Sequence, residues 1–179
     1  FDVNGIIRNP GDISAQTCGT VENIAIALSQ EGCTLADAVR LKVFYTPSDT
    51  CDEITLINAL QEALPKDPSP VISTLPVPLQ PFKGQEIQIQ VIAVRNWRTS
   101  GPFQFETQTL ETPGDVPSKR PIVTTALRAG ELIAVSNRTA AHFNNEIEKF
   151  LDGPGQSHMI MPSLQKSLQA VGASLQDSV

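Results

Sequence analysis

Few residues of this chain have the types and spacing that catalysis by a nucleophile or a metal ion requires. The three cysteines, Cys18, Cys33 and Cys51, show no CxxC spacing and have no pair of histidines near them, so neither a zinc site nor a disulfide framework is expected. His142 and His158 lie far apart, and no serine or cysteine nucleophile motif surrounds them. We therefore predict no metal site and no cofactor.

Two short motifs have simpler structural explanations. Gly153-Pro154-Gly155 is predicted to end a helix, because no strand precedes it and no lysine follows it, as a phosphate-binding loop would need. Asn137-Arg138-Thr139 matches the glycosylation sequon, but the N-terminus lacks the basic and apolar regions of a signal peptide. Neither motif predicts a site.

The composition and charge of the chain limit the classes of partner that we expect it to bind. The 179 residues are 40% hydrophobic, which is enough for one large core or two small ones. The net charge is -6 and the basic residues are scattered, so a nucleic-acid interface is not expected. No run of eighteen apolar residues occurs, so we expect no membrane partner and a cytoplasmic protein. Phe1 in place of methionine indicates a processed chain or a fragment.

Apolar periodicity predicts the elements that position the polar residues. Asp12 is the expected N-cap of a helix over 12–28. The segment 96–119 has no period and contains several glycines and prolines, so it is predicted to be a linker. The other predicted elements are strands over 39–45, 71–75, 86–94, 122–126 and 132–136, a loop over 66–70, and helices over 54–64, 143–151 and 162–171.

The chain also resembles itself with a period of about 140 residues. The matched positions are Leu28, Gly32, Leu35, Asp37 and Val39 against Leu168, Gly172, Leu175, Asp177 and Val179. The first group extends from the end of the predicted helix over 12–28 to the start of the strand over 39–45. The second group extends from the end of the predicted helix over 162–171 to the last residue. This register favours a duplication.

One known family has the same motifs in the same order. The run GDISAQTCGTVENIAIALSQEGCTLADAVRLKVFYTP, followed by INALQEAL, DPSPVISTLPV and EIQIQVIAV, resembles the reactive-intermediate deaminase family, which is also called Rid, YjgF-like or endoribonuclease L-PSP. RPIVTTALRAGELIAVS resembles the family's N-terminal hairpin, and MPSLQKSLQAVGASLQDSV resembles its first helix. The resemblance implies an α+β fold, in which a mixed β-sheet has two helices packed on one face, a chorismate-mutase-like architecture that is duplicated here.

The order of these motifs predicts how the chain is divided. Residues 1–96 would form a first domain that lacks its hairpin, 97–119 a linker, and 120–179 the hairpin and first helix of a second domain. In an alternative arrangement, residues 120–136 fold back and complete the first sheet, as in a circular permutation. The resemblance also implies a homo-oligomer, either a trimer or a pseudo-trimer of tandem domains.

The residues that the family uses for catalysis are replaced in this chain. Family members hydrolyse enamines or imines, with an arginine that grips the substrate carboxylate and a glutamate that positions water. Val71 aligns with that arginine, Gln88 with the glutamate, and Ser73 with a cysteine two residues after the arginine. Asn58 alone matches a polar family residue near the cleft. Carboxylate capture and general-base help are both expected to be lost.

The second copy shows similar replacements. Val123 aligns with the family's hairpin tyrosine, and Asn137 with the glycine after the hairpin serine. Arg95, Arg98 and Arg138 are the nearest candidates for a relocated carboxylate clamp, and Arg138 is the one that the second copy would supply. The predicted ligand-binding residues are therefore Asn58, Val71, Ser73, Gln88 and Arg138.

Three functions stay open at this point. The leading hypothesis is a divergent Rid-like protein that binds a small metabolite, such as a carboxylate or imine, in a cleft between subunits or domains, with deaminase activity weak or absent. The second is an active enamine or imine hydrolase with a relocated clamp. The third is a structural or regulatory assembly domain. Ribonuclease activity is not expected, because the net charge is acidic and no general acid-base pair of histidines is evident.

Overall fold

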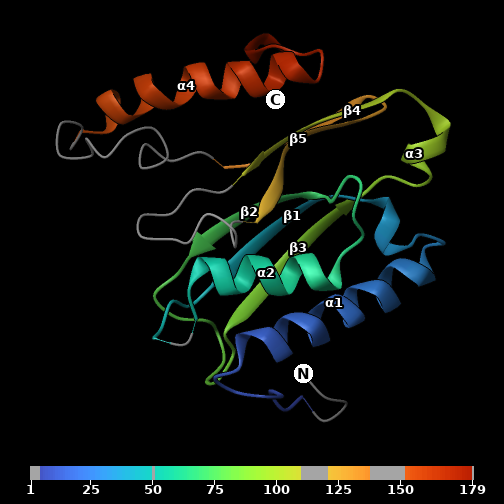
Figure 1. Ribbon diagram of the computed structural model, residues 1–179. Helices are drawn as coiled ribbons and strands as arrows, with labels where there is room; N and C mark the ends of the chain where they lie inside the picture. Colours follow the sequence, from blue (N-terminus) through green and yellow to red (C-terminus); the bar gives the residue numbers. More distant parts are fainter. Residues whose placement is uncertain (1–4, 50, 110–120, 138–151, 179) are drawn as a thin grey trace.

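The computed structural model describes residues 5–49, 51–109, 121–137 and 152–178 and arranges them in four layers (Figure 1). Helices α1 (Ile13–Gln30) and α2 (Glu53–Ala63) form the first layer, and a three-stranded sheet forms the second. Another three-stranded sheet lies on the opposite face, and α4 (Gly153–Ala170) covers its outer side. The layer order is therefore helix, sheet, sheet, helix.

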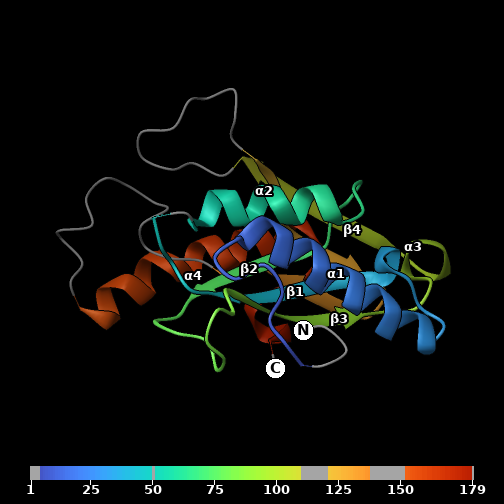
Figure 2. The same ribbon diagram turned by 90° about the horizontal axis from the view of Figure 1, so that it is seen from below.

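The first sheet is mixed, as the sequence predicts. Its central strand, β1 (Ala38–Tyr45), runs parallel to β2 (Val71–Pro76) and antiparallel to β3 (Ile87–Ala93). Both α1 and α2 cover the same face of these strands (Figure 2). The predicted fold class, an α+β fold with two helices on one face of a mixed sheet, is confirmed.

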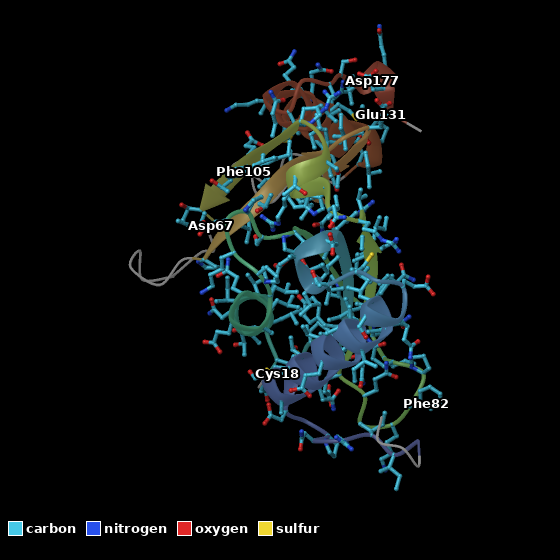
Figure 3. The ribbon with its side chains drawn as sticks, turned by 90° about the vertical axis from the view of Figure 1, so that its right-hand side faces the viewer. Cys18, Asp67, Phe82, Phe105, Glu131 and Asp177 are labelled. Atoms are coloured by element: carbon cyan, nitrogen blue, oxygen red, sulfur yellow. The ribbon has the colours of Figure 1, made fainter. Side chains whose placement is uncertain are left out.

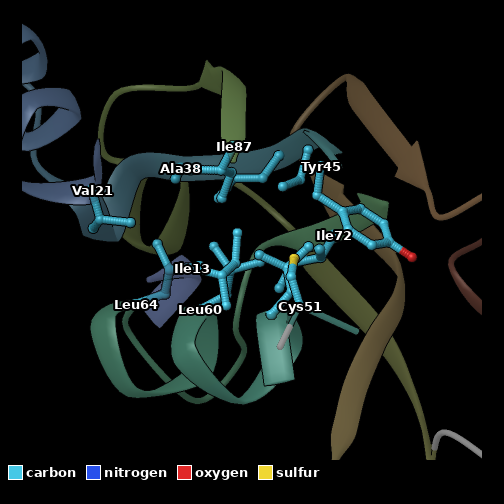
Figure 4. Close-up of a cluster of buried hydrophobic side chains, with 12 residues drawn as sticks. Ile13, Val21, Ala38, Tyr45, Cys51, Leu60, Leu64, Ile72 and Ile87 are labelled. Atoms are coloured by element: carbon cyan, nitrogen blue, oxygen red, sulfur yellow. The ribbon is translucent and has the colours of Figure 1, made fainter. Parts of the chain in front are cut away.

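Capping and apolar spacing explain these helices. The Asp12 carboxylate accepts a hydrogen bond from Ala15 N at 2.9 Å and so begins α1, as predicted. In α2, Leu56 and Leu60 lie one turn apart and are both fully buried against the sheet. They belong to a cluster of buried side chains between the first two layers, which we call the helix core (Figure 4). Burial of each leucine there stabilises the folded chain by about 1.5–3 kcal/mol. The helix core consists of Ile13, Val21, Ala38, Leu41, Val43, Tyr45, Cys51, Leu56, Leu60, Leu64, Ile72 and Ile87.

The second sheet contains the predicted hairpin. Strands β5 (Ile122–Ala129) and β6 (Leu132–Val135) pair antiparallel, and β4 (Phe103–Thr109) pairs with the other edge of β5. Apolar side chains of both sheets meet in an interface core, which consists of Val39, Val71, Trp97, Leu127, Ala129 and Ala134. The two sheets therefore share a buried contact, although no strand pairing joins them among the described residues.

Two sequence predictions are wrong in this region. The expected linker 97–119 contains α3 (Trp97–Ser100) and β4, because Phe103 and Phe105 alternate with polar residues and pair with β5. The hairpin does not complete the first sheet, since β5 is paired on both edges by β4 and β6. The arrangement expected for a circular permutation is thus not observed.

The start of α4 also differs from the prediction. Gly153-Pro154-Gly155 begins this helix instead of ending one, and the Asp152 side chain accepts a hydrogen bond from Gly155 N at 3.1 Å. Proline suits the first turn of a helix because its φ is already helical and its missing N–H would have no partner there. The short helix predicted over 143–151 lies outside the described residues.

The segments that the sequence matches at a spacing of about 140 residues also have similar local geometry. Helices α1 and α4 have bounds 140 positions apart, and each is followed by a single 3-10 turn, η1 (Leu35–Asp37) or η5 (Leu175–Asp177). Gly32 and Gly172 end the two helices with φ of 66° and 73°, a region that glycine adopts readily. The same order of helix, glycine and 3-10 turn thus occurs twice.

The two 3-10 turns contain a matched pair of aspartates. Asp37 accepts hydrogen bonds from Thr34 N at 2.8 Å and Asn96 N at 2.6 Å, whereas its counterpart Asp177 closes only the same capping box with Ser174. Burial alone would raise the pKa of Asp37, but the hydrogen bonds from Thr34 and Asn96 and the charge of Arg95 outweigh it and lower that pKa.

We expect Asp37→Ala to lower the free energy of unfolding by about 1–2 kcal/mol, because it leaves Asn96 N without its acceptor. Asp177→Ala should cost less. The folded pKa of Asp37 lies below the unfolded value, so its contribution is full above about pH 4 and is lost as the pH falls through the folded pKa. Urea unfolding at several acidic pH values tests both points. Equal losses for the two variants would contradict the role of Asn96.

Candidate functional site

A pocket of about 520 Å³ lies where the two sheets meet at the flank of α2. We call it the junction pocket. Asp67 and Phe105, which lie on its two walls, are labelled on the same flank of the molecule in Figure 3. Asp67 belongs to the loop between α2 and β2, and Phe105 belongs to β4. The pocket is therefore built by the first predicted domain together with β4, which falls in the predicted linker, and the start of the hairpin.

The two walls have different chemistry. The wall from the first predicted domain carries amide, hydroxyl and charged groups and consists of Asn58, Gln61 and residues 66–69. The other wall, from β4 and the start of the hairpin, is more apolar and consists of Phe105, Thr107, Pro121, Ile122 and Thr124. A mixed lining of this kind, with a few polar groups among apolar ones, is typical of small-molecule sites.

Hydrogen bonds cross between the two walls. Ser69 Oγ and Thr124 Oγ1 are 2.9 Å apart, and Gln61 donates through Nε2 to the carbonyl oxygen of Ile122. These bonds fix the hairpin strand β5 against α2 and the loop that follows it. The polar groups of the pocket are thereby held in place before any ligand binds, which lowers the entropy cost of binding.

Arg98 fixes the loop between α2 and β2 through hydrogen bonds to its backbone. Its guanidinium donates through Nη1 to Asp67 O at 2.9 Å, through Nη2 to Pro68 O at 2.8 Å and through Nε to Ala36 O at 3.1 Å. It also stacks on Trp97, with 4.4 Å between Cζ and the ring centroid. Burial lowers the pKa of Arg98, and the charges of Asp37 and Asp67 oppose that shift. Its donors are committed to the backbone.

Neither described arginine that the sequence offers as a clamp reaches the pocket. Arg98 is engaged as above, and Arg95 donates through Nη2 to the carbonyl oxygen of Glu31 at the end of α1. Arg138 lies outside the described residues. Among the lining residues that the structure describes, the cation is Lys66, and Asp67 follows it directly. A lysine can pair with a carboxylate as a point charge, but it lacks the bidentate fork of arginine.

The predicted site residues are spread over the fold. Asn58 lines the junction pocket. Val71 is fully buried in the interface core, and Ser73 is 1% exposed and accepts a hydrogen bond from Asn137 N at 3.1 Å, so both lie between the sheets. Gln88 is exposed on β3, on the face opposite the helix core. The structure thus brings Asn58 alone of the described candidates to this pocket.

Sequence reasoning missed the loop residues of the pocket. Asp67 and Ser69 have the same two-residue spacing as Val71 and Ser73 but precede them by four positions, and they reach the pocket where the later pair does not. The sequence signal for these loop residues is the stretch PKDPSP at 65–70, which follows Leu64. Its three prolines are separated by polar residues, and it lies between a helix and a strand. Neither Asp67 nor Ser69 carries the positive charge of the family's arginine.

The fold is of the α+β class, with a mixed sheet that two helices cover on one face and a pocket at the edge of that sheet. A family model described as endoribonuclease L-PSP matches residues 2–95 of the 179, and the chain belongs to this family. In the part of the chain that the structure describes, no helix is long and apolar enough to cross a membrane.

Individual relatives are similar over part of their length. The chain is 33% identical over 86 residues to protein mmf2, mitochondrial, of Schizosaccharomyces pombe, a match that covers 47% of this chain and 66% of that protein. It is also 33% identical to a crystal structure of a YjgF/YER057c/UK114 family member from Mycobacterium tuberculosis, with a TM-score of 0.42 and coverage of 46% and 67%. A Rid family protein from Yersinia pestis matches at 22% identity and a TM-score of 0.47, with coverage of 52% and 70%.

Proposed function

We propose that this chain binds a small polar metabolite in the junction pocket and that its deaminase activity is weak or absent. The observation that supports this proposal is the pocket itself, whose two walls come from segments far apart in the sequence and are joined by the Ser69–Thr124 hydrogen bond. Lys66 offers a positive charge for a carboxylate, and Asn58 offers an amide beside it. A small carboxylate or imine therefore fits the chemistry of the lining.

The same lining argues against fast catalysis. Rid-type hydrolysis needs a firm grip on the carboxylate and a group that positions water, and the described lining offers no arginine for the first task. Gln88, which aligns with the family's glutamate, is an amide and cannot act as a base near neutral pH. Asp67 lies next to Lys66, and its carboxylate opposes the binding of an anion.

Replacing Lys66 should weaken the binding of a small carboxylate. With 2-oxobutanoate as the probe, we expect Lys66→Ala to raise the dissociation constant about fivefold, the effect of one partly exposed charge pair. Titration followed by NMR chemical shifts measures this change. Lys83→Ala is the matched control, because Lys83 is also exposed but lies outside the junction pocket. Equal affinities in all three proteins would contradict binding at this pocket.

An active hydrolase is the second candidate, and Lys66 is the observation that favours it, since a relocated cation could replace the arginine in part. Imines made in situ by an amino-acid oxidase or a threonine dehydratase distinguish the two functions. Ammonia release at the background rate supports a binding protein. Fast release that is lost in Lys66→Ala or Arg138→Ala, with the fold retained, supports a hydrolase.

The tandem arrangement remains part of the proposal. Support comes from the matching bounds of α1 and α4 and from the two capping boxes that follow them. On this view the junction pocket is a cleft between domains of one chain. We also propose assembly into a homo-oligomer, for which the 47% exposed Ile92 on the open face of β3 offers an apolar contact. The cytoplasmic location expected from the sequence stays a prediction.

A further inference from the structure

The first sheet has one face that neither α1 nor α2 covers, and we call it the open face. Residues that pair across strands point to the same side of a sheet, so the strand register shows which residues of β1, β2 and β3 lie on it. The residues of the open face form three cross-strand rows: Val71, Arg40 and Ile92; Ser73, Lys42 and Gln90; Leu75, Phe44 and Gln88. These rows contain two cations and no carboxylate, although the chain as a whole has a net charge of -6.

The second sheet covers part of the open face. It packs against the first sheet mainly through β2 and β5, and Val71 on β2 is fully buried there. On β3, at the other edge of the first sheet, Ile92 is 47% exposed. Arg40 and Lys42 lie between these edges, on the central strand β1, and both are half-buried. The two cations therefore lie where the cover of the second sheet ends.

Arg40 has no partner for its charge in the part of the chain that the structure describes. Its Nε is buried without a hydrogen bond, and no hydrogen bond or ion pair joins its guanidinium to a described residue. Of its three nitrogens, Nε alone is buried in this way, so Nη1 and Nη2 are open to solvent. Arg98 and Arg128 are half-buried as well, but both donate to backbone carbonyl oxygens. A partly desolvated cation without an acceptor destabilises the fold, and an anion on Nη1 and Nη2 would relieve that cost.

Lys42 places a second positive charge next to Arg40. One position on β1 separates the two residues, so their Cα atoms lie about 7 Å apart on the same face. The ammonium group of Lys42 lies 5.2 Å from the ring centroid of Phe44, a contact that orients the charge without neutralising it. Gln90, the cross-strand neighbour of Lys42, is exposed and offers an amide N–H beside it. The open face therefore presents two separate positive charges and a neutral donor.

The separation of the two charges indicates which anion would fit. A guanidinium holds one carboxylate through two parallel hydrogen bonds, and an ammonium group pairs with another as a point charge. Two carboxylates joined by a short carbon chain match two separate cations better than one compact anion does. We propose that the open face binds a small dicarboxylate, with one carboxylate on Nη1 and Nη2 of Arg40 and the other on Lys42 and Gln90.

This site is independent of the function proposed for the junction pocket. No residue of the open face lines that pocket, where the described cation is Lys66 and Asp67 follows it directly. One positive charge beside a carboxylate suits a ligand with a single carboxylate, whereas two positive charges suit a ligand with two. Either site can therefore fail in experiment without the other.

Titration of the full chain with glutarate, followed by NMR chemical shifts, tests the proposal. We expect the amide signals of β1 and β3 to move, while those of Asn58 and Ser69 in the junction pocket stay in place. Propionate, with one carboxylate, and inorganic phosphate, a compact anion, should each bind about tenfold more weakly than glutarate. If no dicarboxylate from malonate to adipate moves the signals of the open face, or if phosphate binds as tightly as glutarate, the proposal is overturned.

Two variants test the assigned contacts. Arg40→Met should raise the dissociation constant of glutarate about tenfold and Lys42→Met about fivefold. Because the charge of Arg40 has no partner, Arg40→Met should leave the Tm of the free protein unchanged or higher. Glutarate should then raise the Tm of the original chain and not that of Arg40→Met. Arg8→Met is the matched control, since Arg8 is an exposed arginine outside the open face.

Other outcomes point to a different partner for the two charges. If Arg40→Met lowers the Tm and glutarate binds it as well as before, Arg40 acts within the fold and the proposal is overturned. If both variants change the mass of the assembly in light scattering and no dicarboxylate binds, carboxylates of a second copy of this chain occupy the open face instead. Lys42→Met removes a charge from a half-buried side chain without touching Arg40, so the test stays decisive if Arg40→Met folds poorly.

Discussion

Replacing Trp97 with alanine should lower the free energy of unfolding by about 3–5 kcal/mol, the usual cost of removing a large buried aromatic side chain. Trp97 is 1% exposed and lies in the interface core between the two sheets, where Val71 and Leu127 also meet. Its Nε1 donates to Ala36 O at 3.1 Å, and its ring contacts Phe103 edge-on with centroids 5.6 Å apart. No other described side chain of this size joins the first sheet to the second.

Urea unfolding followed by far-UV circular dichroism measures this effect, because Trp97 is the only tryptophan and its replacement removes the fluorescence signal. Trp97→Phe keeps most of the apolar volume and loses the indole N–H, so it should cost about 1–2 kcal/mol. A loss below about 1 kcal/mol for Trp97→Ala would show that the two sheets are not coupled through this residue.

The first predicted domain was largely readable from the sequence. The helices and strands between Asp12 and Ala93 were expected within a few residues of their bounds, because caps, apolar periodicity and alternation are local signals. The capping aspartate of α1 is an example, since its position before an amphipathic run is enough to place it. Local physics and the final fold agree in this part of the chain.

Strand β4 shows why the prediction failed further on. Phe103, Phe105 and the polar residues between them alternate, but Gly101-Pro102 before them and the glycine and prolines after Thr109 read as a linker. Pairing with β5 makes this segment a strand, and that pairing joins segments that are about twenty residues apart. Propensity was outweighed by a tertiary contact that no local window contains.

The candidate site was the least predictable part for a related reason. Ser69 reaches Thr124, a residue 55 positions later, and this contact joins the loop to the other wall of the pocket. An ungapped comparison with family motifs instead selects Val71 and Ser73, which the fold buries between the sheets. Spacing along one strand shows which residues share a face, but it does not show which face another segment will cover.

Arg98 is expected to be the second most sensitive position, with a loss of about 2–3 kcal/mol for Arg98→Ala. The change removes a charged donor from the carbonyl oxygens of Asp67 and Pro68 and the stacking contact with Trp97. Arg98→Lys should restore little of this stability, because a compact ammonium cannot reach three carbonyl oxygens at once. Full rescue by lysine would show that the charge matters and the planar fork does not.

This substitution should also loosen the junction pocket, since the two freed carbonyl groups belong to its loop wall. Amide hydrogen exchange should become faster at Lys66, Asp67 and Ser69 of Arg98→Ala, while the amides of α1 keep their protection. Arg95→Ala is the matched control, because Arg95 also donates to a backbone carbonyl but does so at Glu31, away from the pocket. If both variants accelerate exchange in the loop equally, Arg98 does not position that wall, and the binding proposed for the junction pocket must tolerate a mobile loop.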